Sequence, residues 1–252
     1  MTAATGSSTT IQSVARASRI LVAVAGSSGG LTAQQVADRL DLGLSTAYHL
    51  LSTLAEEGML SKVEGRRYAL GPVLGEIAAT IVRELRPPAR YLRALNQVAE
   101  ATGETAYLTG WHVGTITILA TVEGAHAVRV AGLETGFSES VHARASGKLL
   151  LAFAEPAARD ALLGTHELTR YTPATLTDAA RFDEELDRIR AAGEAHDREE
   201  YREGVRTLAR PILENGTVTA ALAVSAPAAR FEAHEDAIRS ALAAACRAAQ
   251  LG

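Results

Sequence analysis

The feature that most constrains this fold is a pair of short helical patterns joined by a tight turn. Apolar residues recur at helical spacing over residues 32–40 and again over residues 45–57, with the turn at residues 41–43. Thr32 is a suitable N-cap for the first pattern, and Gly58 ends the second. Two helices joined by so short a turn have to cross and pack together, which predicts a helix-turn-helix.

The residues on either side of this pair complete a winged helix-turn-helix. Residues 13–25 have the apolar spacing of another helix, and residues 59–63 and 66–70 have the character of two short strands. The Glu-Gly pair between these strands suits a hairpin turn. Three helices followed by a hairpin predict a winged domain that binds DNA.

The helix over residues 45–57 is the candidate recognition helix. Its opposite face is polar and has no acidic residue before Glu56, and its apolar face carries Ala47, Leu50, Leu51 and Leu54. An ordinary amphipathic helix with a solvated face would give the same pattern, so the helix alone leaves that alternative open. Hydroxyl and imidazole groups can hydrogen-bond base edges or phosphate oxygens. The candidate DNA-binding residues of this helix are Ser45, Thr46, Tyr48, His49, Ser52 and Thr53.

Basic residues outside the recognition helix favour DNA binding over the solvated alternative. The helix has no Lys or Arg, so we expect phosphate contacts from other residues, including Arg16, Lys62, Arg66 and Arg67. The net charge of the whole chain is -4, but residues 1–86 carry 8 basic and 7 acidic side chains. The acidic excess therefore lies in the rest of the chain, and the first segment is free to approach DNA.

The rest of the chain is long and apolar enough for a second domain. Hydrophobic residues make up 47% of the 252 residues. We expect a disordered tail over residues 1–10, a DNA-binding domain over 11–71, a linker helix over 72–88 and a second domain over 89–252. For that domain the patterns predict helices over residues 89–102, 146–153, 156–163, 178–192 and 232–251, and strands over 105–111, 115–123, 127–133, 205–213 and 218–225.

Short motifs follow one another in a fixed order along nearly the whole chain. They occupy residues 13–21, 36–40, 44–51, 68–71, 102–105, 142–148, 192–193, 197, 199–200, 204–205, 211 and 225–227. Each motif is weak by itself, but their order and spacing from about residue 11 to residue 251 resemble the IclR family of regulators.

This resemblance implies an α+β protein with an N-terminal winged helix-turn-helix and a C-terminal GAF-like α/β effector-binding domain that has an antiparallel sheet. It implies a sequence-specific transcriptional regulator whose partners are an operator in double-stranded DNA, a small-molecule effector and further copies of the chain, in a dimer or tetramer. Repressor and activator both stay open. His49 stands where the family commonly has Arg, and Thr207 stands where many members have Cys, so the operator and the effector stay open as well.

The start of the helix over residues 146–153 suits an anion. Exposed backbone N–H groups at a helix N-terminus, together with the helix dipole, favour a carboxylate. A plain helix cap at Ser146 is the alternative. The resemblance places the effector, a small organic or aromatic acid, at Ala145, Ser146, Gly147, Asp197, Thr207 and Ser225.

Other classes of protein fit the residues less well. The single cysteine, Cys246, has the spacing of a buried core residue, and residues 196–200 contain possible metal ligands but no tight histidine pair. We therefore expect no catalytic residue, no metal and no cofactor. The chain has no long apolar run and no secretory signal pattern, so we expect a cytoplasmic protein with no membrane partner. A small-molecule enzyme and a GAF-type signalling module without DNA contact are the alternative functions.

Overall fold

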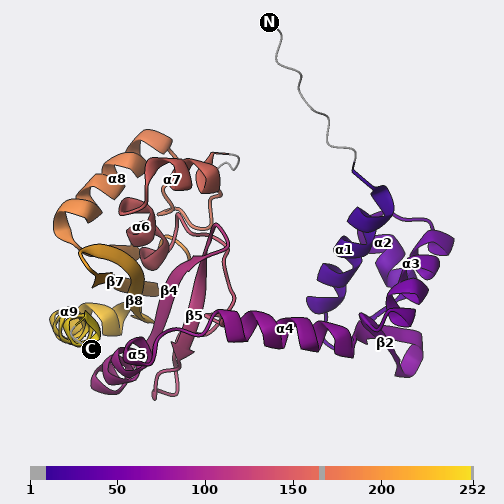
Figure 1. Ribbon diagram of the computed structural model, residues 1–252, viewed down its shortest axis with the longest axis horizontal. Helices are drawn as coiled ribbons and strands as arrows, with labels where there is room; N and C mark the ends of the chain where they lie inside the picture. Colours follow the sequence, from indigo (N-terminus) through magenta and orange to yellow (C-terminus); the bar gives the residue numbers. More distant parts are fainter. Residues whose placement is uncertain (1–9, 165–167, 251–252) are drawn as a thin grey trace, which may run out of the picture. The chain divides into compact units, whose positions relative to one another are not determined.

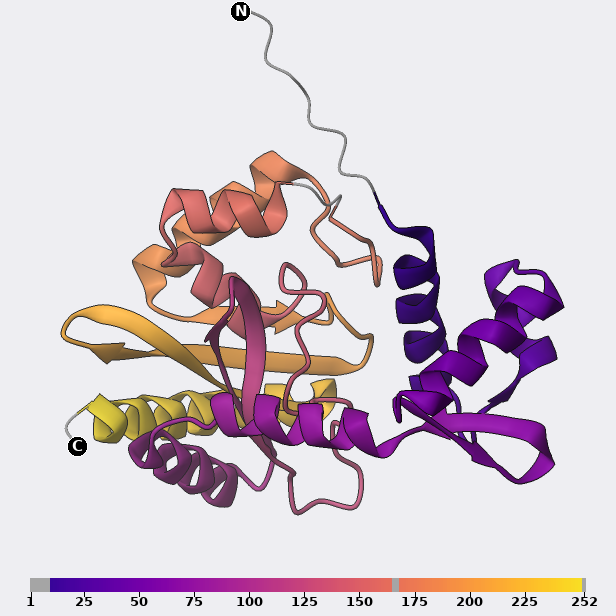
Figure 2. The ribbon, with the colours of Figure 1, turned by 45° about the vertical axis from the view of Figure 1, so that its right-hand side comes forward.

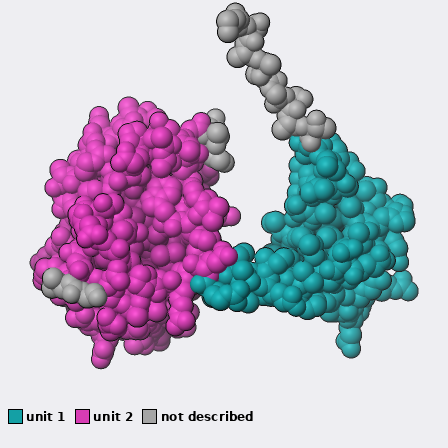
Figure 3. All heavy atoms as spheres, in the orientation of Figure 1, with its two compact units in different colours: residues 1–83 teal, residues 84–252 magenta. Residues whose placement is uncertain are grey.

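The computed structural model describes residues 10–164 and 168–250, and the chain forms two compact units that divide between Arg83 and Glu84 (Figure 1). Figure 3 colours unit 1 teal and unit 2 magenta. Each unit has a hydrophobic core of its own. Helix α4 (Pro72–Glu84) carries the chain from the first unit to the second.

Unit 1 is the predicted winged helix-turn-helix. It packs helices α1 (Gln12–Ala25), α2 (Ala33–Leu40) and α3 (Leu44–Glu56) against strands β1 (Leu31–Thr32), β2 (Leu60–Val63) and β3 (Arg67–Leu70). The strands form an antiparallel sheet in the order β1-β3-β2. The core of this unit comprises Ile20, Val24, Leu31, Val36, Ala37, Ala47, Leu51, Leu54, Leu60 and Tyr68.

Local chemistry fixes both ends of α2. The Thr32 hydroxyl accepts from the N–H of Gln35 at 3.2 Å, and the Gln35 side chain accepts from the N–H of Thr32 at 2.9 Å. This reciprocal capping box satisfies two N–H groups that the helix itself leaves unpaired. At the other end Asp41 takes a left-handed conformation with φ 51°, which ends the helix and turns the chain into α3.

Unit 2 is built on an antiparallel sheet with strand order β5-β4-β8-β7-β6. Helices cover both faces of it: α5 and α9 one face, α6 and α8 the other (Figure 2). The strands are β4 (Thr105–His112), β5 (Thr115–Val122), β6 (Ala195–Arg198), β7 (Val205–Glu214) and β8 (Thr217–Pro227). The helices are α5 (Ala89–Thr102), α6 (Ala145–Ala152), α7 (Pro156–Leu163), α8 (Ala179–Ala192) and α9 (Ala228–Gln250).

Alternation along β8 explains why both faces are covered. Leu222 and Val224 pack under α5 and α9, whereas Ala221 and Ala223 face α6. Successive side chains of a strand point to opposite faces, so the unbroken apolar run at residues 220–224 has to be buried on both. The alanines leave room on their face, where α6 lies close to the sheet.

The structure confirms the predicted fold class and corrects some of the elements. The strand predicted over residues 127–133 is wrong, because this segment is irregular. Strands β1 and β6 are additional, and α9 begins at Ala228 rather than at residue 232. In the part of the chain that the structure describes, none of the helices combines the length and the apolar character needed to cross a bilayer.

Candidate DNA interface and ligand pocket

Helix α3 presents the polar face expected of a recognition helix. Ala47, Leu51 and Leu54 are buried in the core of unit 1, so the opposite face points outward. One of its hydroxyls is already engaged, since Thr53 donates to the carbonyl oxygen of His49 at 3.0 Å. On this face Thr46 and Ser52 are half-buried, and the exposed residues are Ser45, Tyr48, His49 and Thr53.

A groove of about 600 Å³ runs beside α3 and the β2–β3 hairpin. Tyr48 of α3 lines it together with Lys62 and Arg66 of the hairpin. At the hairpin tip Gly65 and Arg66 have φ values of 73° and 56°, a left-handed pair that turns the chain sharply. Arg66 and Arg67 are both exposed there. The hairpin is therefore a basic wing beside a polar helix, the arrangement that suits a duplex.

Of the residues predicted to contact DNA, only Tyr48, Lys62 and Arg66 line the groove, and two further polar residues line it that were not predicted. Thr32 and Gln34, at the N-terminus of α2, line the same groove as Tyr48. The sequence feature that could have identified them is the predicted helix cap at Thr32, since the N-terminus of a helix favours phosphate. Arg16 lies instead in a second surface depression, beside Arg19 and the turn that follows α2.

A second site lies at one end of the unit 2 sheet. Strand pairing sets Asp197 opposite Thr207, and Thr207 opposite Ser225. The hydroxyls of Thr207 and Ser225 are 2.6 Å apart, and all three side chains line one small cavity. Register therefore brings together three of the residues predicted for the effector. The remaining lining residues are Tyr107, Val130, Leu133, Arg144, Tyr201, Arg202 and Val205.

Asp197 is almost fully buried at this cavity. Burial raises its pKa to about 7, and this effect exceeds the opposing one of the Glu200 N–H, which donates to Oδ1 at 2.7 Å. A carboxyl group is neutral below its pKa, so near pH 7 Asp197 is present in both forms. The protonated form is a hydrogen-bond donor as well as an acceptor.

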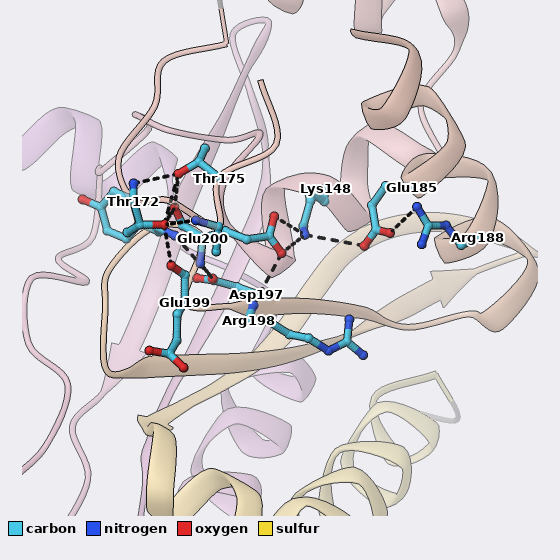
Figure 4. Close-up of polar contacts among 11 residues, drawn as sticks. Lys148, Thr172, Thr175, Glu185, Arg188, Asp197, Arg198, Glu199 and Glu200 are labelled. Carbon is cyan, nitrogen blue, oxygen red and sulfur yellow. Dashed lines mark hydrogen bonds and ion pairs between the residues drawn. The ribbon is translucent and has the colours of Figure 1, made fainter. Parts of the chain in front are cut away.

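A buried ion pair supports the loop that follows Asp197. Lys148 of α6 is fully buried, and its Nζ lies 2.6 and 2.7 Å from the two carboxylate oxygens of Glu200 and 3.6 Å from Glu185 (Figure 4). The hydroxyls of Thr172 and Thr175 donate to the carbonyl oxygen of Glu200 at 3.2 and 2.6 Å. Lys148 therefore holds this loop against α6 and does not face solvent.

The other three predicted effector residues lie beside the cavity but not in its lining. Ala145, Ser146 and Gly147 form the buried first turn of α6. The Ser146 hydroxyl accepts from the Thr109 hydroxyl at 3.1 Å. A side chain at Gly147 would lie 2.1 Å from the carbonyl oxygen of Val141, so backbone covers that side of the turn. Their role as ligand contacts stays a prediction.

Arg144 is one of the seven lining residues that the sequence did not predict. It precedes α6, only 4% of it is exposed, and its guanidinium lies among aromatic rings. Arginine is almost never fully buried without a partner, so the sequence offered no reason to place this side chain inside.

The catalytic and metal-binding alternatives gain no support from the described residues. Burial raises the pKa of the Cys246 thiol to about 12, and its sulfur lies 3.9 Å from the carbonyl oxygen of Arg210. A thiol with so high a pKa is a poor nucleophile at neutral pH. Within residues 10–164 and 168–250, no group of three His, Cys, Asp or Glu residues is placed to hold a metal ion.

Comparison with known proteins covers both units. A model of the IclR helix-turn-helix domain matches residues 13–64, and a model of the C-terminal domain of bacterial IclR transcriptional regulators matches residues 82–250. The HTH-type transcriptional regulator BhcR of Paracoccus denitrificans is 35% identical over 235 residues, which is 90% of this chain and 84% of that protein. The glycerol operon regulatory protein of Streptomyces griseus is 35% identical over 225 residues, 88% of this chain and 87% of that one.

Solved structures agree with these matches. An IclR transcriptional regulator from Silicibacter sp. TM1040 is 30% identical, with a TM-score of 0.71 and 94% of each chain covered. An IclR homologue from Microbacterium hydrocarbonoxydans, solved with 4-hydroxybenzoate, has the same fold at 24% identity, with a TM-score of 0.71 and coverage of 95% of this chain and 100% of that one.

Proposed function

Because the chain belongs to the IclR family of bacterial transcriptional regulators, we propose that a small organic acid bound in the unit 2 cavity controls how unit 1 binds its operator. The chain is a helix-turn-helix regulator and not an enzyme, since the relatives that it matches over most of their length are named as transcriptional regulators. The proposal concerns the ligand, the site and the coupling between them. The proposal includes a cytoplasmic location, because a regulator of transcription has to reach its DNA.

The row of Asp197, Thr207 and Ser225 carries this proposal. It places a carboxyl group and two hydroxyls side by side in the lining of a cavity that Val130 and Leu133 also line. A few convergent polar groups among apolar side chains are typical of a small-molecule site. The Microbacterium relative solved with 4-hydroxybenzoate supports an acid as the class of ligand.

The size of the cavity suggests how a ligand would act. Its volume is about 20 Å³, which holds little more than one water molecule. An organic acid therefore enters only if side chains such as Tyr201 and Leu133, which belong to irregular segments, move outward. A ligand that selects this expanded state shifts the population of the protein toward it. A coupling of about 1–3 kcal/mol to the DNA site changes the affinity for operator roughly 5- to 150-fold.

We infer that the chain acts as a dimer or tetramer. In the described part of the chain, α4 buries none of its residues. Ile77 and Ile81 lie one turn apart on this helix and are 45% and 43% exposed. Pairing this stripe with that of a second copy removes apolar surface from water and joins two DNA-binding units. Binding of two half-sites together offsets the weak contact that a helix without Lys or Arg makes alone.

A footprint of the DNA that flanks the gene for this protein tests the proposal. The footprint is measured without ligand and then with aliphatic 2-oxo acids, hydroxy acids and aromatic acids. One class of acid is expected to shift the protein concentration needed for protection, while the acid itself is recovered unchanged. Protection that no acid alters would remove the proposed control, and consumption of an acid would indicate an enzyme.

A further inference from the structure

Arg144 is a buried cation enclosed by aromatic rings at the edge of the cavity. Its guanidinium carbon lies 4.8 Å from the ring centroid of Phe137, 5.7 Å from that of Tyr107 and 6.0 Å from that of Tyr201. The rings favour a cation, but they supply no hydrogen-bond acceptor in the plane of the guanidinium. That plane carries five N–H donors around one positive charge.

The hydrogen bonds of Arg144 are incomplete. Nη1 donates to the carbonyl oxygen of Glu139 at 3.3 Å. Nε and Nη2 are buried, and no atom of the described chain accepts a hydrogen bond from either. Buried charged donors without acceptors destabilise a fold. Their retention in a cavity therefore points to an acceptor that comes from outside the chain.

These two nitrogens form one edge of the guanidinium, and their N–H bonds run parallel. The same edge is filled elsewhere in this chain: Nε and Nη2 of Arg230 donate to the two carboxylate oxygens of Glu104 at 2.6 and 2.9 Å. A bidentate pair of this kind fits the planar carboxylate in both spacing and charge. At the cavity, Oδ1 of the Asp197 carboxyl accepts from the N–H groups of Glu200 and Tyr201, and neither carboxyl oxygen accepts from the open edge of Arg144.

We propose that the Nε–Nη2 edge of Arg144 binds the carboxylate of the effector, and that the effector is an aromatic monocarboxylate. One guanidinium edge accommodates one carboxylate. Tyr107 and Tyr201, whose rings lie near the guanidinium, also line the cavity and offer aromatic surface to the body of the ligand, which favours a planar ring over an aliphatic chain. This inference rests on the proposed function only in placing the effector in this cavity.

Paired ligands that differ in charge alone test this role. Calorimetry with the full chain compares benzoate with benzamide, and 4-hydroxybenzoate with 4-hydroxybenzamide. Arg144→Met removes the charge, whereas Arg144→Lys keeps the charge and loses the bidentate edge. Arg210→Met is the matched control, since Arg210 lies on β7 and pairs with Glu194 outside the cavity. The unfolding temperature of each variant shows whether it is folded.

The carboxylates are expected to bind the parent at least about tenfold more tightly than the amides, because charge-assisted pairs are the stronger ones. Arg144→Met should abolish this preference, Arg144→Lys should reduce it, and Arg210→Met should retain it. If Arg144→Met does not fold, the loss of preference in Arg144→Lys decides the question. An unchanged preference in the folded Arg144 variants would overturn the inference, and so would the absence of carboxylate binding to the parent.

Each failure has a separate meaning. If acids still shift the operator footprint but Arg144→Met does not change their affinity, the proposed function stands and Arg144 has no part in it. Acids that bind through Arg144 but leave operator affinity unchanged would confirm the carboxylate site and remove the proposed control.

Discussion

Thr207 and Ser225 face each other across β7 and β8, and their hydroxyl oxygens lie 2.6 Å apart at the wall of the cavity. Both residues are 2% exposed. Each hydroxyl therefore depends on the other, or on a ligand, for its hydrogen bonds. The hydrogen bond between the two hydroxyls stabilises the fold, and the same hydroxyls are available to a ligand. Substitutions at the two positions measure the contribution to stability separately from the contribution to binding.

A double-mutant cycle measures the stability role. Thr207→Val leaves the Ser225 hydroxyl buried without its partner, which should lower the free energy of unfolding by about 1–3 kcal/mol. Adding Ser225→Ala removes the orphaned group, so the double variant should be less destabilised than the sum of the two single variants. Urea unfolding of the three variants checks this. Strict additivity would show that the two hydroxyls are not coupled.

The basic wing predicts that DNA affinity depends less on salt once the arginines of the wing are removed. Replacing Arg66 and Arg67 with Ala should weaken binding to all DNA sequences and lower the slope of log affinity against log salt by about 2, since each phosphate contact contributes about 0.9. Fluorescence anisotropy between low and moderate salt gives this slope. The control removes Arg181 and Arg188, two exposed arginines of α8. Equal slopes in the parent and the wing variant would contradict the wing assignment.

The apolar stripe of α4 predicts assembly. Ile77→Glu with Ile81→Glu should lower the sedimentation coefficient to that of a monomer and weaken operator binding, because like charges would meet across the paired helices. Gly75→Glu with Ala79→Glu puts the same charge on the opposite face of α4 and should have no effect. A side chain at Gly75 meets no atom within 4 Å. A parent chain that sediments as a monomer and still binds operator tightly would refute this prediction.

Asp197 predicts a pH dependence of stability. Burial raises its pKa from 3.8 to about 7, so between these values the folded protein holds a proton that the unfolded chain has lost. Stability from this group is therefore greatest near pH 4, falls as the pH rises to about 7 and is constant above it. The total loss is up to about 4 kcal/mol. Asp197→Asn retains the acceptor for Glu200 and should remove this component. The free energy of unfolding of the parent and the variant is measured by urea unfolding at each pH from 4 to 8. If it changes with pH in the same way in both proteins, the prediction is contradicted.

Local patterns in the sequence predicted the parts of the fold that local interactions determine. The α2–α3 pair and the wing follow from apolar spacing, caps and a Glu-Gly turn. The β7–β8 hairpin follows from Asn215 and Gly216, whose φ values of 51° and 81° suit a tight turn. Strand β6 was missed because Ala195–Arg198 has no apolar alternation, and only its pairing with β7 makes it a strand.

The cavity of unit 2 could be predicted less well from the sequence, because contacts between distant segments bring its lining residues together. The predicted strand over residues 127–133 is an irregular segment in which Val130 and Leu133 are buried at the cavity but Val128 is 69% exposed. Its apolar residues serve the cavity wall rather than a pleated face. Arg144 gave no local signal, because its burial results from rings that lie near it only in the folded chain.

Thermodynamic reciprocity tests the central claim most directly. Operator affinity is measured by anisotropy with and without saturating 4-hydroxybenzoate, and the affinity for 4-hydroxybenzoate is measured by calorimetry with and without saturating operator. If the cavity of unit 2 controls unit 1, the two measurements give the same factor, roughly between 5 and 150, because coupling between sites is mutual. Binding of the acid at equal affinity to the free and the DNA-bound protein would contradict the account.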